Sequence, residues 1–271
     1  MIYRILSLHN ITFKEGLKDK SILAIFFIAI LTCIAILVFP NLFARDIGKV
    51  CIDVALSSIT LLGLIFIFFT CSSLLTKDVD KKTIYVVLAR PYSRAEYVIG
   101  KYLGFLSLLI FVITAVSLLA TLAVYACYHH NISYFPKNFS FYEYTLAIFM
   151  ITEMLAILVA LLLFFSSLTT QGFTATILTL ASFIIGSSLN DVLTTISNSS
   201  ADIKVSKGVS FIIKLVKYLF PNLSLFDFKL QVAHGVKIPV QTINNVLLYG
   251  IVYIVLLLII SSFMYKKKEF S

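Results

Sequence analysis

The chain is dominated by long runs of apolar residues that are separated by short charged stretches. A helix needs about 20 apolar residues to cross a hydrocarbon layer roughly 30 Å thick. Five runs approach or exceed this length without a charge, and a sixth is interrupted only by Glu153. They cover Ile22–Pro40, Val54–Leu75, Tyr102–Tyr128, Tyr144–Leu168, Phe173–Leu189 and Val246–Tyr265. The pattern therefore predicts six transmembrane helices.

These runs favour an all-α membrane fold in one transmembrane domain, 1–271. They lack the period-two alternation of barrel strands, and helices satisfy their own backbone hydrogen bonds in lipid. Gln171 and Gly172 mark a turn between the fourth and fifth runs, because one helix across both would be far too long. The predicted spans are 21–40, 53–75, 98–128, 144–168, 173–190 and 244–265.

Composition excludes a water-soluble domain. Hydrophobic residues make up 60% of the chain and charged residues 13%, whereas soluble domains carry about 25% charged residues. The four cysteines lie in or at the ends of apolar runs without C-x-x-C spacing, which is typical of small buried hydrophobic residues. Cys51 and Cys127 are expected near the outer face, where a disulfide bond between them is possible but unsupported by any spacing. The remaining cysteines are Cys33 and Cys71.

The distribution of basic residues predicts the orientation. Lys and Arg gather in the first twenty residues, in the loop after the second span and in the C-terminal tail, whereas the alternate short loops carry only Arg45, Lys49 and Lys137. The positive-inside rule then places both termini and the loop 76–97 in the cytoplasm of a cell (inner) membrane protein. The segment 191–243 is expected on the outer side of the membrane. Its many lysines argue against this orientation, because the rule places basic residues inside.

Two segments outside the spans have amphipathic patterns. In residues 1–20, Ile2, Ile5, Leu6, Phe13 and Leu17 share one face, which predicts an interfacial helix rather than a cleaved signal peptide. From Val205 to Phe220, apolar residues recur at helical spacing up to Pro221. That helix would lie at the membrane surface or pack over the bundle.

Catalytic motifs are absent from the sequence, including the G-x-x-x-x-G-K-[ST] phosphate loop, H-E-x-x-H and G-x-S-x-G. Glu153 is the clearest intramembrane charge, about 14 Å into its run, close to the midplane. It is a candidate for a translocation path, or a structural carboxyl group bonded to a neighbouring helix. Asp53 and Asp191 are expected at helix ends near water, and His129 with His130 lacks a third metal ligand.

The loop after the second span has the pattern of a helix, a turn and a second helix. Pro91 ends the first helix, and Ser93 with Glu96 forms a capping box for the next one. Ile84, Val87 and Leu88 form an apolar ridge that charged residues flank, and a solvated loop would not need such a ridge. Burial of the ridge would supply affinity and the charges would set register, so we expect the first helix to dock on a partner.

This loop resembles the cytoplasmic loop of type-2, exporter-like ABC transporter permeases. The resemblance rests on Thr83-Ile84 with Leu88, Arg90-Pro91-Tyr92-Ser93-Arg94, Glu96-Tyr97, and Gly100-Lys101 with Gly104. The chain departs from the family pattern at Lys82, where Gly is usual, and at Asp78, where Glu is common. The resemblance implies a coupling helix within Asp78 to Arg90, seated on a separate ATP-binding subunit.

The residues assigned to this coupling are Asp78, Lys81, Thr83, Ile84, Val87, Leu88, Arg90, Pro91, Arg94 and Glu96. Gly100 and Gly104 are expected to permit close helix contact. The resemblance further implies a second permease subunit, identical or related, with ATP and Mg held by the ATP-binding subunits and no cofactor, metal or nucleic acid bound by this chain. Two other hypotheses are a structural or assembly subunit of a larger membrane complex, and an ion-conducting protein built around Glu153.

Overall fold

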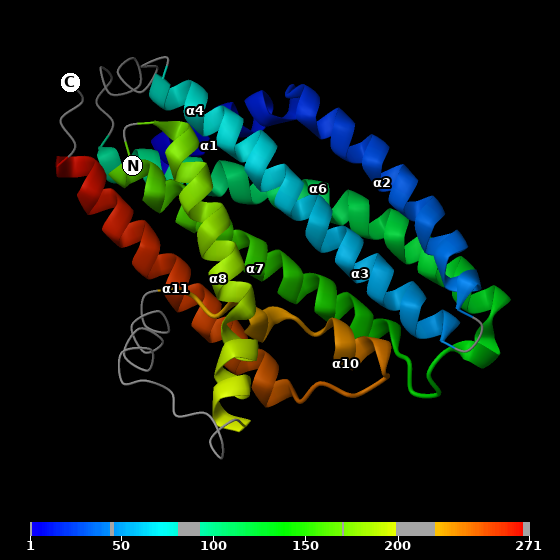
Figure 1. The fold of residues 1–271 in the computed structure, drawn as a ribbon. Helices are drawn as coiled ribbons and strands as arrows, with labels where there is room; N and C mark the ends of the chain where they lie inside the picture. The colour runs from blue at the N-terminus through cyan, green and yellow to red at the C-terminus, as the bar shows by residue number, and fades with distance from the viewer. Residues whose placement is uncertain (1, 44–45, 81–92, 170, 199–219, 268–271) are drawn as a thin grey trace.

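The computed structural model describes residues 2–43, 46–80, 93–169, 171–198 and 220–267, and within these ranges the ordered elements are helical (Figure 1). Six of the described helices are long and apolar enough to cross a membrane, which confirms the predicted number and the all-helical class. The main helices are α1 (Ile2–Leu17), α2 (Lys20–Val38), α3 (Ile47–Ile65), α4 (Ser72–Asp80), α6 (Arg94–His130), α7 (Phe141–Leu168), α8 (Gly172–Asn198), α10 (Lys229–Ala233) and α11 (Val240–Lys267).

Local sequence explains where several of these helices begin and end. Asp19 caps α2 by accepting a hydrogen bond from the backbone of Ser21, and Ser140 caps α7 in the same way through Tyr142. Pro40 follows α2 in the short 3₁₀ turn Phe39–Leu42, because proline cannot continue the helix. The turn predicted at Gln171 and Gly172 is present between α7 and α8. α8 continues to Asn198, so Asp191 lies within a helix and not at its end.

A π-helical turn, Phe66–Cys71, joins α3 to α4 without a break in the helix axis. Together they form one long helix, Ile47–Lys77, which covers the second predicted span. Asp53, expected at a helix end, lies exposed in the second turn of α3. π turns interrupt the regular hydrogen-bond ladder and often occur at functional positions in helices.

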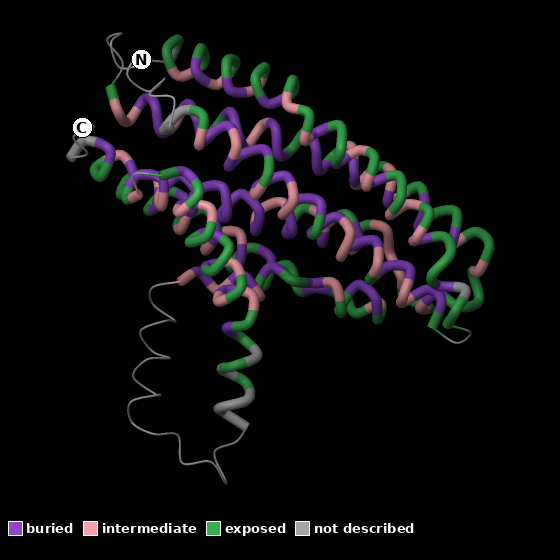
Figure 2. Tube along the Cα trace, turned by 45° about the horizontal axis from the view of Figure 1, so that its top comes forward, coloured by how far each residue is buried: buried purple, intermediate pink, exposed green. Residues whose placement is uncertain are grey.

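The core lies along α7, which is the most buried of the six long helices. It packs against α3, α6, α8 and α11, whereas α2 and α11 have the smallest buried shares of the six. Figure 2 shows buried positions where the helices meet and exposed positions along their outward faces. Apolar exposed side chains on these faces are what a lipid-facing surface requires.

α1 begins and α11 ends at the same end of the bundle (Figure 1), which we call the termini end. α4 ends there and α6 begins there. α6 contains 37 residues, so at 1.5 Å per residue it is about 55 Å long and exceeds a hydrocarbon core of roughly 30 Å. α1 packs beside the first turns of α6.

The described part of the predicted external segment dips into the bundle. Leu223 and Phe226 belong to a 3₁₀ turn, Leu223–Phe226, and both are fully buried. Phe226 reaches Gly250 in α11, about 15 Å from the start of that helix. Irregular backbone at this depth is tolerated because protein buries it. The predicted helix from Val205 to Phe220 lies almost entirely outside the described residues.

Candidate functional site

The predicted coupling residues divide into two groups by their place in the chain. Asp78 lies in the last turn of α4, and Arg94 and Glu96 lie in the first turn of α6. The other residues assigned to docking lie outside the described ranges; they are Lys81, Thr83, Ile84, Val87, Leu88, Arg90 and Pro91. The structure therefore describes the two helices to which this segment is attached.

The start of α6 is fixed by the capping box that the sequence predicts. The Ser93 hydroxyl accepts a hydrogen bond from the Glu96 backbone N–H at 3.2 Å, and Glu96 Oε2 accepts from the Ser93 N–H at 2.8 Å. Glu96 is only 5% exposed. Its carboxylate thus satisfies a backbone donor at the helix N-terminus, where negative charge is also favourable.

Tyr265, near the end of α11, joins three helices at the termini end. The Arg94 guanidinium of α6 donates a hydrogen bond to the Tyr265 backbone carbonyl. The Tyr265 ring packs edge-on against Tyr97 at 5.9 Å between centroids, and its hydroxyl lies 2.7 Å from the Ser166 hydroxyl of α7. A cation at the last carbonyls of a helix satisfies groups that have no intrahelical partner. Arg94 therefore stabilises the contact between α6 and α11.

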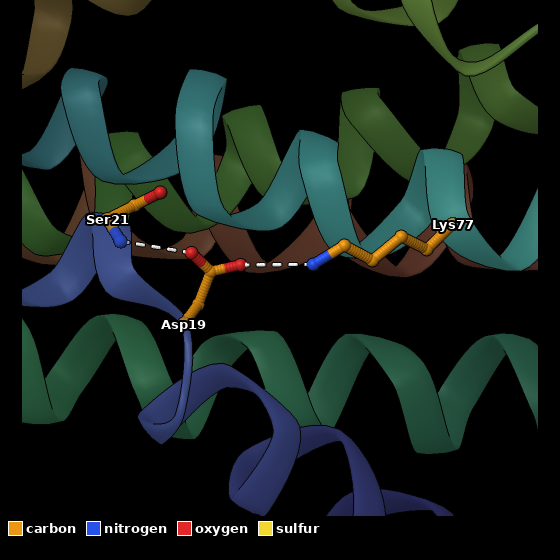
Figure 3. Close-up of polar contacts among 3 residues, drawn as sticks. All are labelled: Asp19, Ser21 and Lys77. Atoms are coloured by element: carbon orange, nitrogen blue, oxygen red, sulfur yellow. Dashed lines mark hydrogen bonds and ion pairs between the residues drawn. The ribbon is translucent and has the colours of Figure 1, made fainter.

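An ion pair holds the end of α4 to the connection between α1 and α2 (Figure 3). Lys77 Nζ lies 3.4 Å from Asp19 Oδ2, and Asp19 Oδ1 accepts from the Ser21 N–H at 3.0 Å. Burial by itself raises the pKa of Asp19, but the hydrogen bonds from Ser21 and the charge of Lys77 outweigh burial and leave the pKa below its ordinary value. The carboxylate is 11% exposed, so solvent screens this pair less than a fully exposed one.

α4 also contacts the start of α8 closely. The hydroxyls of Ser72 and Thr176 lie 2.5 Å apart, and a Cβ on Gly172 would overlap Thr76 Oγ1. Packing against Thr76 therefore favours glycine at position 172. Sequence reasoning identified only the turn.

Gly100 and Gly104 lie beneath α1. A Cβ on Gly100 would lie 2.8 Å from the Leu8 side chain, and one on Gly104 would lie 2.6 Å from Thr12 Cβ. Gly16 of α1 meets Leu108 in the same way, so the two helices run parallel with their backbones close. The face of α1 that packs on α6 therefore includes Leu8, Thr12 and Gly16, which the amphipathic pattern did not identify.

Glu153 lies near the middle of α7, about 18 Å from the helix start. A Cβ on Gly250 would lie 2.9 Å from its Oε1, and the Phe226 ring lies beside the same glycine. Oε1 is buried, and no hydrogen-bond donor reaches it among the described residues. The predicted alternative of a carboxyl group bonded to a neighbouring helix therefore has no support at this oxygen.

Other candidate groups do not assemble into a site within the described ranges. No group of three or more His, Cys, Asp or Glu residues there could hold a metal ion. All four cysteines are free thiols. His129 and His130 are exposed in the last turn of α6.

Residues 6–270 match the family described as ABC-2 family transporter protein. The chain belongs to the ABC-2 transporter family. No curated protein matches the chain. Membership extends the resemblance of the loop to nearly the whole sequence, and the chain is a multi-pass membrane permease component of that family. ABC-2 permease components are typically non-catalytic, and the family implies an ATP-binding subunit as partner.

Proposed function

We propose that this chain is the membrane-spanning subunit of an ABC exporter or flippase and couples ATP hydrolysis by a separate subunit to movement of a substrate. Both termini and the loop 76–97, which contains the docking segment 78–90, face the cytoplasm. α1 lies at the membrane interface, and two permease subunits work together with two ATP-binding subunits. ATP and Mg are held by those partners. The substrate path includes the middle of α7 at Glu153.

The observation that carries this proposal is the anchoring of both helices that flank the docking segment. On one side, Lys77 and Thr76 of α4 contact Asp19 and Gly172. On the other side, the capping box and the Arg94–Tyr265 contact fix the start of α6. A displacement of the docking segment by an ATP-binding subunit would therefore be transmitted through α4 and α6, because contacts within the chain hold the end of α4 and the start of α6.

From these two helices the displacement has two routes into the bundle. α4 continues through the π turn into α3, which packs along α2, α6 and α7. α6 packs against α1, α2, α3, α7 and α11, so a tilt of α6 would change several helix contacts at once. The π turn offers a position at which α3 and α4 bend relative to each other, since its ladder is already irregular.

Co-purification with the ATP-binding subunit tests the docking role. We expect Leu88→Asp or Arg90→Glu to abolish recovery of the ATP-binding subunit while membrane insertion is unchanged. Arg94 is less suitable for this test because it binds Tyr265 of its own chain. Lys49→Glu is a matched control, because the Lys49 side chain is about half exposed at the start of α3 and forms an ion pair with Asp46, three residues earlier.

Two outcomes separate the hypotheses. Loss of the ATP-binding subunit from the segment variants, with normal recovery from Lys49→Glu, supports coupling. Unchanged recovery from both segment variants contradicts the docking role and leaves a structural or assembly subunit of a membrane complex.

A further inference from the structure

A groove runs between α6 and α7 on the surface of the bundle, with a cavity volume of about 380 Å³. Glu153 lies in its wall. Ile110 and Phe149 flank it and are 49% and 54% exposed, so the groove opens sideways from the bundle and not only towards its ends. A molecule dissolved in the lipid layer could therefore enter it laterally.

Four hydroxyl groups that line the groove already donate their hydrogen bonds within the protein. Each donates to a backbone carbonyl about one turn earlier in its own helix, at 2.6–3.0 Å: Thr114, Ser117, Thr145 and Thr152. A hydroxyl group has one donor and two acceptor lone pairs, so these oxygens now offer only acceptors. The polar part of the groove therefore complements a ligand that donates hydrogen bonds.

The charge of the groove points to the same ligand. Among the described residues that line it, Glu153 is the single ionisable group and none carries a positive charge. Its Oε1 is buried against Gly250 of α11 and has no donor within the described residues. An intramembrane carboxylate requires a cationic or donor partner, which the lining does not supply.

We propose that the α6–α7 groove binds a single-chain amphiphile with a primary ammonium head, which donates to the Glu153 carboxylate and to the threonine and serine oxygens. The apolar chain lies along the aliphatic and aromatic wall. This deepens the proposed function and rests on it, since the amphiphile is the class of substrate that the transporter would move. A phosphate-bearing headgroup does not fit, because its negative charge would face Glu153 without a basic side chain nearby.

A neighbouring groove extends the apolar wall. It lies between α1 and α6, with a volume of about 300 Å³, and shares Leu106 and Ile110 with the first groove. Its lining is almost wholly apolar, apart from His9 and Ser107.

The absence of tryptophan from the sequence gives the test a clean optical reporter. The full-length variant Phe149→Trp is reconstituted in phosphatidylcholine bilayers, and 12-bromododecylamine is added as a quencher. Phe111→Trp is the matched reporter control, because Phe111 is similarly exposed on α6 but does not line the groove. The same titration is repeated with 12-bromododecanol, which has the same chain and no charge.

We expect the amine to quench the indole fluorescence of Phe149→Trp saturably. Half-saturation should require a concentration at least about tenfold higher when Glu153→Gln is added, since hydrogen bonds to charged groups are the stronger ones. Glu153→Asp should restore much of the affinity, and Thr114→Val should weaken it by about threefold at most. The alcohol should quench the two reporter variants alike and should be insensitive to Glu153→Gln.

The proposal is overturned if the amine quenches Phe149→Trp equally with and without Glu153→Gln, or if the alcohol binds as tightly as the amine. Phosphatidylethanolamine added to the bilayer should not displace the amine, and displacement would overturn the proposal in favour of a zwitterionic lipid. Size-exclusion profiles of the variants exclude misfolding as the cause of lost binding. Because no ATP-binding subunit is present, this result is independent of the co-purification test.

Discussion

Charged side chains at the termini end and in the middle of the bundle differ in whether the chain itself supplies a partner. At the termini end, Glu96, Arg94 and Asp19 each have a partner within the chain at hydrogen-bond or ion-pair distance. In the middle, Glu153 Oε1 is buried and has none among the described residues. Satisfied groups rigidify a structure, whereas an unsatisfied buried group carries a desolvation cost. We therefore associate the termini end with transmission of movement from the ATP-binding subunit and the middle of the bundle with substrate binding.

Tyr265→Ala should show the largest effect, because Tyr265 is 2% exposed and joins α6, α7 and α11. We expect a loss of about 3 kcal/mol or more in the free energy of unfolding, measured in detergent with increasing dodecyl sulfate. Tyr265→Phe keeps the ring and removes only the hydroxyl contact to Ser166, so it should cost about 1 kcal/mol. Equal losses in the two variants would show that ring packing does not hold this junction together.

Ser93→Ala should destabilise the start of α6 by about 1 kcal/mol, since alanine cannot accept the hydrogen bond from the Glu96 N–H. Ser93→Gly is the control, because glycine is tolerated at this position and should cost only a few tenths of a kcal/mol. Recovery of the ATP-binding subunit with each variant then measures whether a firm α6 start is needed for coupling. A glycine variant as unstable as the alanine variant would contradict the capping explanation.

Asp19→Asn should have a smaller effect that depends on pH. Asparagine still caps α2, so the substitution isolates the charge, and an ion pair of this kind contributes about 0.2–1 kcal/mol at pH 7. Because the folded-state pKa of Asp19 lies below its ordinary value of about 3.9, the contribution is present above that pH and is lost as pH falls through the lower pKa.

The measurement is the difference in unfolding temperature between the wild-type chain and Asp19→Asn from about pH 7 to about pH 3, a range that approaches the ordinary pKa of an aspartate and passes below it. It should shrink towards zero at the acid end. Asp46→Asn is the comparison variant, because the Asp46 carboxylate is far more exposed than that of Asp19 and its pair with Lys49 should contribute less. A difference for Asp19→Asn that is constant with pH would exclude the ion pair as its source.

Glu153→Gln should cost no stability at all, in contrast to every substitution at the termini end. Replacement of a buried carboxyl group that lacks a donor removes a desolvation penalty, so we expect a free energy of unfolding equal to or above that of the wild-type chain. The same dodecyl sulfate titration measures it. A loss comparable to that of Ser93→Ala would mean that Glu153 is a structural group, and the contrast between the two regions would fail.

Local patterns predicted a substantial part of this architecture. Six apolar runs correspond to six helices, the turn at Gln171 and Gly172 lies between α7 and α8, and the Ser93–Glu96 capping box is present. These features depend on neighbours in sequence, because apolar length and cap residues act within one helix. The pattern in residues 1–20 predicted an amphipathic helix but not the face that packs on α6, since Thr12 and Gly16 on that face are small and weakly apolar.

Long-range contacts escaped sequence reasoning for a different reason. The contact of Arg94 with Tyr265 spans 171 positions in the chain, and no local pattern pairs an arginine with a backbone carbonyl. The dip of Leu223 and Phe226 into the bundle was also missed, because a lysine-rich segment between two spans looks external. Its buried residues are few and lie in a short turn without helical or strand periodicity.

The sequence by itself determined that this chain is a six-helix membrane protein with a charged loop of the ABC permease type, because hydropathy and short motifs are properties of consecutive residues. Only the tertiary structure decided which polar groups find partners in distant parts of the chain. Glu96 and Glu153 are both acidic residues near or within an apolar run; the sequence assigns Glu96 to a capping box with Ser93 but leaves the surroundings of Glu153 open. One closes a capping box and the other faces Gly250 without a donor among the described residues, since hydrogen bonding depends on what the fold brings within about 3 Å.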